Sequence, residues 1–169
     1  MDLTRSTGSF RRVLILDCDD TLWGGVVGEV GIEGIQLDPD STPGRYFMAF
    51  QESVLRLMSQ GVDIALNSKN DAEDVLNVLD NHPHCLIKRH HLSALRVNWH
   101  DKASNVRELV EVLEAGPEEC VFVDDSEDEC RVVREAFPLV KVVQVPANLE
   151  SLKGILFQDG LFSQLEESD

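Results

Sequence analysis

Short apolar runs alternate along this chain with longer stretches whose apolar residues recur at helical spacing. The runs predict four buried strands, over residues 13–16, 62–66, 120–123 and 140–145. The periodic stretches predict four helices, over 45–60, from Asp71, from Asp101 and over 126–137. This alternation predicts an α/β fold, a doubly wound parallel sheet of the Rossmann-like type. The stretch from His82 to His100 predicts only irregular structure or a short strand.

The length of the chain and its loops predict a simple domain organisation. We expect the 169 residues to form one domain, with frayed ends at about 1–10 and 160–169. A glycine-rich connector, Gly24 to Gly44, follows the first strand. No insertion is long enough for a large cap domain. The connector, a docked partner or a second protomer must therefore cover any site that has to exclude water.

Composition and charge exclude several classes of partner. The formal net charge of −16 opposes non-specific binding of nucleic acid, because phosphate backbones repel such a surface. No stretch approaches the ~20 apolar residues of a membrane span. The segment Met1 to Arg12 lacks the apolar core of a signal peptide, so we expect a cytoplasmic protein. Four scattered cysteines without metal-site spacing predict reduced thiols, namely Cys18, Cys85, Cys120 and Cys130.

Polar residues stand where the predicted strands end. Asp17 and Asp19 follow the first strand, Ser68 follows the second, and Asp124 and Asp125 follow the third. In parallel sheets ligands gather at the carboxyl ends of the strands, so these side chains are expected to converge. Two carboxylates two residues apart suit Mg²⁺, and a carboxylate can also attack phosphorus. The pattern therefore favours phosphate chemistry.

These positions resemble the motifs of the haloacid-dehalogenase-like phosphotransferase superfamily. The first motif, Asp-x-Asp-x-Thr after a strand, corresponds to residues 17–21. A Ser or Thr that ends a strand corresponds to Ser68, and a Lys that opens a helix corresponds to Lys102. An acidic pair that ends a strand corresponds to Asp124-Asp125. Each pattern alone is weak, but four in the required order make the resemblance specific.

A narrower resemblance, to the FkbH-like subfamily, covers nearly the whole chain. It is carried by Asp-Cys-Asp-Asp-Thr-Leu-Trp-Gly-Gly-Val-Val-Gly-Glu from Asp17, by Ser-Lys-Asn from Ser68, by Trp99-x-Asp-Lys102, and by Phe-Val-Asp-Asp with Glu129 downstream. The resemblance is to a catalytic domain alone. It implies a polyketide-pathway enzyme that dephosphorylates 1,3-bisphosphoglycerate and delivers a glyceryl thioester to an acyl carrier protein. Asp20 departs from the subfamily, which usually has Asn there, and adds negative charge beside the site.

The resemblance also implies roles for the residues. Asp17 would be the phosphoryl nucleophile and a Mg²⁺ ligand. Asp19 would offer its backbone carbonyl to the metal and its side chain as general acid and base. Lys102 would neutralise the phosphoryl group in the transition state. Ser68 would hydrogen-bond the phosphoryl group, and Asp124 and Asp125 would complete the metal site.

Other residues near the motifs have two interpretations each. Cys18 would be the acyl nucleophile, its pKa lowered by magnesium and Lys102, or a small buried apolar residue. Gly24 and Gly25 would allow close backbone approach to the substrate. Lys69 and Asn70 would contact a second phosphate, or belong to a turn and cap.

Four smaller predictions concern residues around the site. Thr21 is expected to fix the loop through its hydroxyl, and Ser126 with Glu129 predicts a capping box. Trp99 is interpreted as a packing residue. Asp71 is expected to cap its helix, and the five histidines are expected at the surface.

Two alternatives to the transferase remain. The first is a magnesium-dependent small-molecule phosphatase that forms an aspartyl phosphate without acyl transfer. The second is a receiver-type signalling domain, which combines an acidic pair, a phosphorylated Asp, a hydroxyl and a Lys. In a receiver domain the acidic pair follows the first strand, whereas here it comes last.

Overall fold

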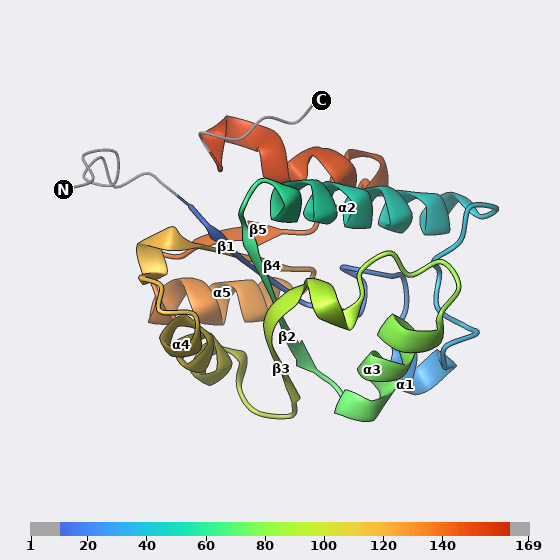
Figure 1. The fold of residues 1–169 in the computed structure, drawn as a ribbon, viewed down its shortest axis with the longest axis horizontal. Helices are drawn as coiled ribbons and strands as arrows, with labels where there is room; N and C mark the ends of the chain where they lie inside the picture. Colours follow the sequence, from blue (N-terminus) through green and yellow to red (C-terminus); the bar gives the residue numbers. More distant parts are fainter. Residues whose placement is uncertain (1–10, 163–169) are drawn as a thin grey trace.

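The computed structural model describes residues 11–162, in which helices cover a five-stranded sheet (Figure 1). Along the chain the elements are β1 (Val13–Leu16), α1 (Val27–Val30), α2 (Thr42–Ser59), β2 (Asp63–Lys69), α3 (Ala72–Asn81), η2 (Arg89–His91), β3 (Leu92–Asn98), α4 (Lys102–Val112), η3 (Pro117–Glu119), β4 (Cys120–Asp124), α5 (Glu127–Ala136), β5 (Lys141–Gln144) and η4 (Leu149–Gly160). Adjacent strands are parallel, in the order β3-β2-β1-β4-β5. The predicted doubly wound parallel sheet is confirmed, and the described residues contain no large cap domain.

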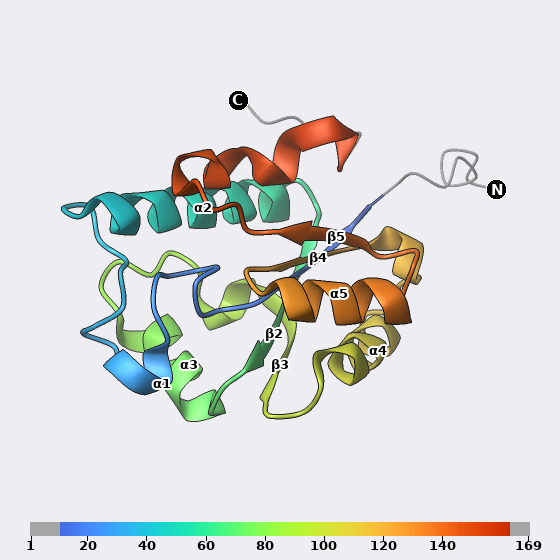
Figure 2. The same cartoon turned by 180° about the vertical axis from the view of Figure 1, so that it is seen from behind.

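Alternate residues of the central strands build two separate cores. Leu14 and Leu16 of β1 point to the face that α2, α3 and η4 cover. Val13 and Ile15 point to the opposite face, under α4 and α5. The two layers of helices are visible from both sides of the sheet (Figure 2). Because both faces are buried, β1 is apolar throughout, which is why its pattern was readable from sequence.

The edge strand β3 was only partly predicted. The sequence Leu-Ser-Ala-Leu-Arg-Val-Asn forms a strand, but most of its residues are only half-buried. It pairs with β2 on one side alone, and the pairing shifts register between Ile64 and Ala65. An edge strand lacks the continuous apolar run of a buried one, so its pattern is weak. The second strand is also longer than predicted and continues to Lys69, because the polar residues after Leu66 still pair with β3.

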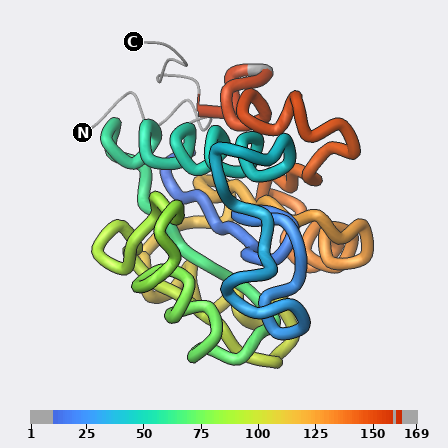
Figure 3. Tube along the Cα trace, turned by 90° about the vertical axis from the view of Figure 1, so that its right-hand side faces the viewer, coloured from blue at the N-terminus to red at the C-terminus, as the bar shows by residue number. Residues whose placement is uncertain are grey.

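The connector after β1 lies across the carboxyl edge of the sheet. Figure 3 faces this edge, with the connector drawn in blue in front of the strands. Its short helix α1 packs near α3, and Gly24 pairs with Gln36 through two backbone hydrogen bonds of 3.0 and 2.8 Å. The connector therefore covers one side of the place where the motif residues meet.

The ends of the described chain bear on two predictions. Leu161 and Phe162 are buried in the core, so the packed chain extends past the predicted frayed point at 160. The predicted frayed segments 1–10 and 163–169 lie outside the described residues. Among the helices that are described, none has the length and apolar composition that crossing a membrane requires.

Candidate active site

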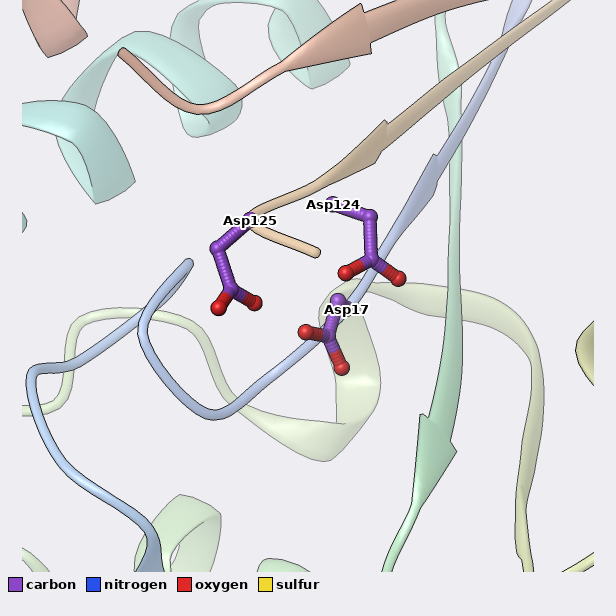
Figure 4. Close-up of side chains that lie close together, drawn as sticks. All are labelled: Asp17, Asp124 and Asp125. Atoms are coloured by element: carbon purple, nitrogen blue, oxygen red, sulfur yellow. The ribbon is translucent and has the colours of Figure 1, made fainter. Parts of the chain in front are cut away.

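Three carboxylates from neighbouring strands meet at the carboxyl edge of the sheet (Figure 4). Asp17 directly follows β1, and Asp124 ends β4, whose Val123 carbonyl accepts a hydrogen bond of 3.0 Å from the Asp17 backbone N–H. Asp125 follows at once. One carboxylate oxygen from each of the three lies within 4.8 Å of the others, the spacing that a single cation can bridge.

Lys102 lies against this cluster as its counter-charge. Its Nζ atom is 3.1 Å from Asp17 Oδ1 and also donates to Asp124 Oδ2, with only 4% of the lysine side chain exposed. The Asp101 carboxylate caps α4 by accepting from two backbone N–H groups, and Asn67 Nδ2 donates to the Lys102 carbonyl at 3.0 Å. The start of α4 is thereby held in place, with its lysine aimed at the nucleophile candidate.

The cluster carries more negative charge than one lysine can offset. Burial raises the pKa of Asp17 well above its ordinary value, and the charge of Asp124 raises it further, although Lys102 opposes this. Burial and the charges of Asp124 and Asp20 also raise the pKa of Asp125. Burial alone would lower the pKa of Lys102, but Asp17 and Asp124 raise it above its ordinary value. A divalent cation with a preference for oxygen ligands would relieve this repulsion, so the donor set fits Mg²⁺.

The second carboxylate of the first motif is held by hydrogen bonds from three donors. Asp19 Oδ1 accepts from Trp23 Nε1 and from the Val27 backbone N–H, each at 3.0 Å. Asp19 Oδ2 accepts from Asn70 Nδ2 at 2.9 Å, and the same amide donates to Ser68 Oγ at 3.0 Å. Asn70 therefore links the first and second motifs. These bonds fix the orientation of Asp19, whose proposed role as acid and base stays a prediction.

Two unusual backbone angles form the turn after the first motif. Asp20 adopts a left-handed conformation with φ 57°, which Asp and Asn tolerate better than most residues. Its Oδ1 accepts a 2.7 Å hydrogen bond from the backbone N–H of Gly25, whose φ is 94°. A Cβ on Gly24 would lie 2.5 Å from Gln36 Oε1, so this glycine permits close packing within the protein. Substrate approach at the two glycines stays a prediction.

An ion pair that the sequence did not predict links the ends of β2 and α5. Lys69 Nζ lies 2.9 Å from Glu129 Oε2. Half of the predicted capping box is present, because Ser126 Oγ accepts from the Glu129 backbone N–H at 3.2 Å. The Glu129 carboxylate, however, faces Lys69. Lys69 was predicted to contact phosphate only because it stands next to Ser68 in the sequence. Its partner Glu129 lies 60 residues away, so no local pattern could predict the pair.

Cys18 lies in the apolar core rather than in the open site. None of its surface is exposed, and it packs in the core cluster beneath the connector. Burial raises the pKa of its thiol well above the ordinary value, and the charge of Asp17 raises it further. Ser68 and Lys102 lower it, but by less. Lys102 therefore lowers the pKa of Cys18 as predicted, but burial raises it by more.

Four minor predictions were wrong in whole or in part. The Thr21 hydroxyl has no hydrogen-bond partner among the described residues, and its backbone N–H ties the turn by donating to the Cys18 carbonyl. The side chain of Trp99 is 67% exposed, and its indole N–H donates to Asp71. Asp71 stands at the N-cap position of α3, as predicted, but its side chain makes no capping hydrogen bond. Of the five histidines expected at the surface, His82 alone is buried, and its Nδ1 accepts from the His84 backbone N–H.

Comparison with known protein families identifies the chain. Residues 12–141 match the family described as NLI interacting factor-like phosphatase. The chain belongs to this family. The match contains all four motifs, from the strand before Asp17 to the acidic pair at 124–125. A comparison with curated protein sequences finds no match.

Solved structures extend the comparison. The N-terminal part of BF1531 from Bacteroides fragilis, which contains a phosphatase domain and was crystallised with Mg, is 34% identical with a TM-score of 0.85. It covers 99% of this chain, but the chain covers only 44% of that protein. The HAD family enzyme BT-2542 from Bacteroides thetaiotaomicron, solved with magnesium and inorganic phosphate, is 15% identical over 82% of this chain and 96% of its own, with a TM-score of 0.57. The likeness to BT-2542 shows the fold.

These comparisons confirm the coarser predictions. The haloacid-dehalogenase-like fold is confirmed, and the acid cluster of this chain offers the oxygen ligands that the predicted Mg²⁺ requires. The narrower FkbH-like resemblance stays a prediction.

Proposed function

We propose that this chain is a magnesium-dependent phosphatase that acts on a small phosphorylated molecule through an aspartyl phosphate. One observation carries the proposal: the buried carboxylate of Asp17 lies within 4.8 Å of two further acids and 3.1 Å from the ammonium of Lys102. A nucleophile needs this combination, because a cation and a lysine together offset the charge of an incoming phosphate. Membership of a phosphatase family supports the same function.

The residues divide the reaction between them. An Asp17 oxygen attacks phosphorus, the bond to the substrate oxygen breaks, and Asp19 gives that oxygen a proton. Water then attacks the aspartyl phosphate, Asp19 takes a proton from the water, and the bond from phosphorus to Asp17 breaks. Lys102 and Ser68 bind the phosphoryl oxygens throughout. Magnesium, held by Asp17, Asp124 and Asp125, would neutralise charge on the phosphoryl group.

The test measures phosphate release from a panel of phosphate monoesters, with magnesium and with a chelator. We expect turnover only with magnesium, and a loss on the order of 10³-fold or more in Asp17→Asn, because that change removes the nucleophile. The variant Asp63→Asn at the opposite end of β2 is the matched control. Full turnover by Asp17→Asn, or in chelator, would overturn the proposal.

A second candidate is the glyceryl transferase of polyketide biosynthesis. The thiol of Cys18, between Asp17 and Asp19 and in contact with Ser68, favours it. The sulfur would attack the acyl carbon of 1,3-bisphosphoglycerate and expel the acyl phosphate, which leaves a phosphoglyceryl thioester on Cys18. The remaining phosphate would pass to Asp17 and then to water, and the thiol of an acyl carrier protein would take over the glyceryl group by thioester exchange. The complete burial of Cys18 opposes this candidate, because the first motif would have to open for the attack.

Intact mass separates the two candidates. The chain is incubated with 1,3-bisphosphoglycerate, magnesium and a carrier protein. A glyceryl adduct that disappears in Cys18→Ser and persists in the control Cys85→Ser supports the transferase; Cys85 is also a buried thiol. Phosphate release without any adduct supports the phosphatase and contradicts the transferase.

A further inference from the structure

A side pocket of about 400 Å³ opens next to the acid cluster. Its wall includes Asp125 of the cluster, Asp20 of the turn and Gln36 of the connector. Phe47 of α2, with Gln144 and Leu149 from the end of β5 onward, closes the other side. Five separate segments thus build one pocket at the carboxyl edge of the sheet.

The pocket lies within reach of the reacting phosphorus. Asp125 lines the pocket, and one of its carboxylate oxygens lies within 4.8 Å of an oxygen of Asp17. A phosphoryl group attacked by Asp17 would therefore lie beside the wall of the pocket that Asp125 forms. The volume is at the small end of the range for ligand sites, about 300–1,000 Å³. It suits the organic group of a small phosphate monoester.

The lining of the pocket has a definite chemical character. Two carboxylates, Asp20 and Asp125, and two amides, Gln36 and Gln144, share the wall with apolar side chains. Within the described part of the chain, none of the residues that line it is a lysine or an arginine. Amides can bond hydroxyl or amide groups, and the apolar wall can cover carbon. An anionic group here would meet carboxylates without a counter-charge.

The basic residues of the site lie elsewhere and have partners. Lys102 contacts Asp17 and Asp124, and Lys69 contacts Glu129. Even when magnesium offsets Asp125, the charge of Asp20 remains. That charge is held in position, because Asp20 Oδ1 accepts the hydrogen bond from the Gly25 backbone N–H.

We propose that the organic group of the substrate occupies this side pocket, an inference that rests on the proposed phosphatase reaction. Asp20 then selects an uncharged, hydroxyl-bearing group in the pocket over an anionic one. The substrate class is then a small polyol or similar monophosphate. A substrate with a second phosphate or a carboxylate would have to direct that group toward Lys69.

Two nearly isosteric substrates test the proposal. Glycerol 3-phosphate ends in CH₂OH where 3-phosphoglycerate ends in a carboxylate. With the full chain and magnesium, we expect kcat/KM to be at least about tenfold higher for glycerol 3-phosphate, because of repulsion by Asp20 across a few ångströms. Equal values, or a preference for 3-phosphoglycerate, would overturn the proposal.

The variant Asp20→Asn isolates the charge. Asn keeps an oxygen for the Gly25 N–H and tolerates the left-handed backbone. We expect the preference between the two substrates to fall severalfold, while Glu111→Gln, an exposed charge removal on α4, leaves it within about twofold. An unchanged preference in Asp20→Asn would contradict the role of Asp20.

The variant Ala147→Trp tests the location, because it fills the pocket from its exposed rim. We expect kcat/KM for glycerol 3-phosphate to fall by much more than the rate of oxygen-18 exchange between inorganic phosphate and water. The exchange uses the phosphoryl site without an organic group. The pocket assignment would be overturned if Ala147→Trp lowered both rates equally. It would also be overturned if the wild-type protein catalysed the exchange but did not turn over glycerol 3-phosphate. Absence of exchange in the wild type would instead count against the proposed phosphatase.

Discussion

The two sides of the site differ in charge and in burial. On the side of β2 and α4, Ser68, Asn70 and Lys102 present hydrogen-bond donors, and Lys102 is nearly fully buried. On the side of β4 and β5, Asp124 and Asp125 present acids, and the latter opens onto the side pocket. In the proposed reaction, the first side would bind the phosphoryl oxygens, and the second would hold the metal and the organic group.

The strand order explains how the two sides are joined. Because β1 lies between β2 and β4, Asp17 stands at the centre, and contacts between the two sides must pass its strand. Lys102 makes such a contact deep in the site, and the Lys69–Glu129 pair makes another with 40% of the lysine side chain exposed. A buried pair is costly to break, whereas a partly exposed pair can exchange partners.

The largest effect is expected when Lys102 is replaced. Lys102→Met removes the cation that offsets Asp17 and Asp124, so kcat should fall about 10²–10³-fold. Breaking a buried pair should also lower the free energy of unfolding in chelator by about 3 kcal/mol. Urea titration and phosphate release measure both, with the exposed Lys141→Met as control. A Lys102→Met variant with normal kcat and normal stability would contradict the assignment of Lys102 as the counter-charge of Asp17 and Asp124.

Metal removal should destabilise the acidic side in a pH-dependent manner. The folded pKa values of Asp17 and Asp125 lie above the unfolded value of 3.8, so the folded chain binds protons more tightly. In chelator, the free energy of unfolding should therefore fall as pH rises from about 4 toward neutrality. Magnesium at one fixed concentration, set to 100 times its Kd at pH 7.5, should restore about 2.7 kcal/mol there and less at pH 5, because protons compete for the carboxylates at the lower pH. Denaturation at pH 5 and pH 7.5 checks this, and an equal magnesium effect at both pH values would contradict it.

A moderate effect is expected at the residue that links two motifs. Asn70→Ala removes the donor to Asp19 and Ser68, so kcat should fall about tenfold, equivalent to the loss of one hydrogen bond of ~1.4 kcal/mol. Binding of magnesium should change little, since Asn70 lies outside the acid cluster. The exposed Asn81→Ala at the end of the following helix α3 is the control. A tenfold loss of magnesium affinity would show that the two sides are not separate.

The smallest effect is expected at the partly exposed ion pair. Lys69→Met and Glu129→Gln should each change the free energy of unfolding by less than about 1 kcal/mol. Freed of its partner in Glu129→Gln, Lys69 should bind anions better and lower the KM for substrates with two anionic groups. Kinetics with 3-phosphoglycerate measure this. A higher KM in that variant would show that the pair itself, and not the lysine, is required.

Local patterns account for most of the elements and for the motif residues. The strand β1 was recognisable because both of its faces are buried, and α4 because its apolar residues recur at helical spacing. The edge strand β3 was ambiguous because its residues are only half-buried. The convergence of Asp17 with Asp124 followed from the rule that parallel strands end at one edge.

The sequence by itself therefore determined the parallel α/β fold class, four of the five strands, the order of the motifs and the acids that can hold a cation. Only the tertiary structure decided that Cys18 is buried, that Lys69 pairs with Glu129, and that Asp20 faces a pocket shared with Gln144. The physical reason is the range of the interactions. Periodic burial acts between residues a few positions apart, whereas these contacts depend on the path of the connector and on which strands lie beside β1.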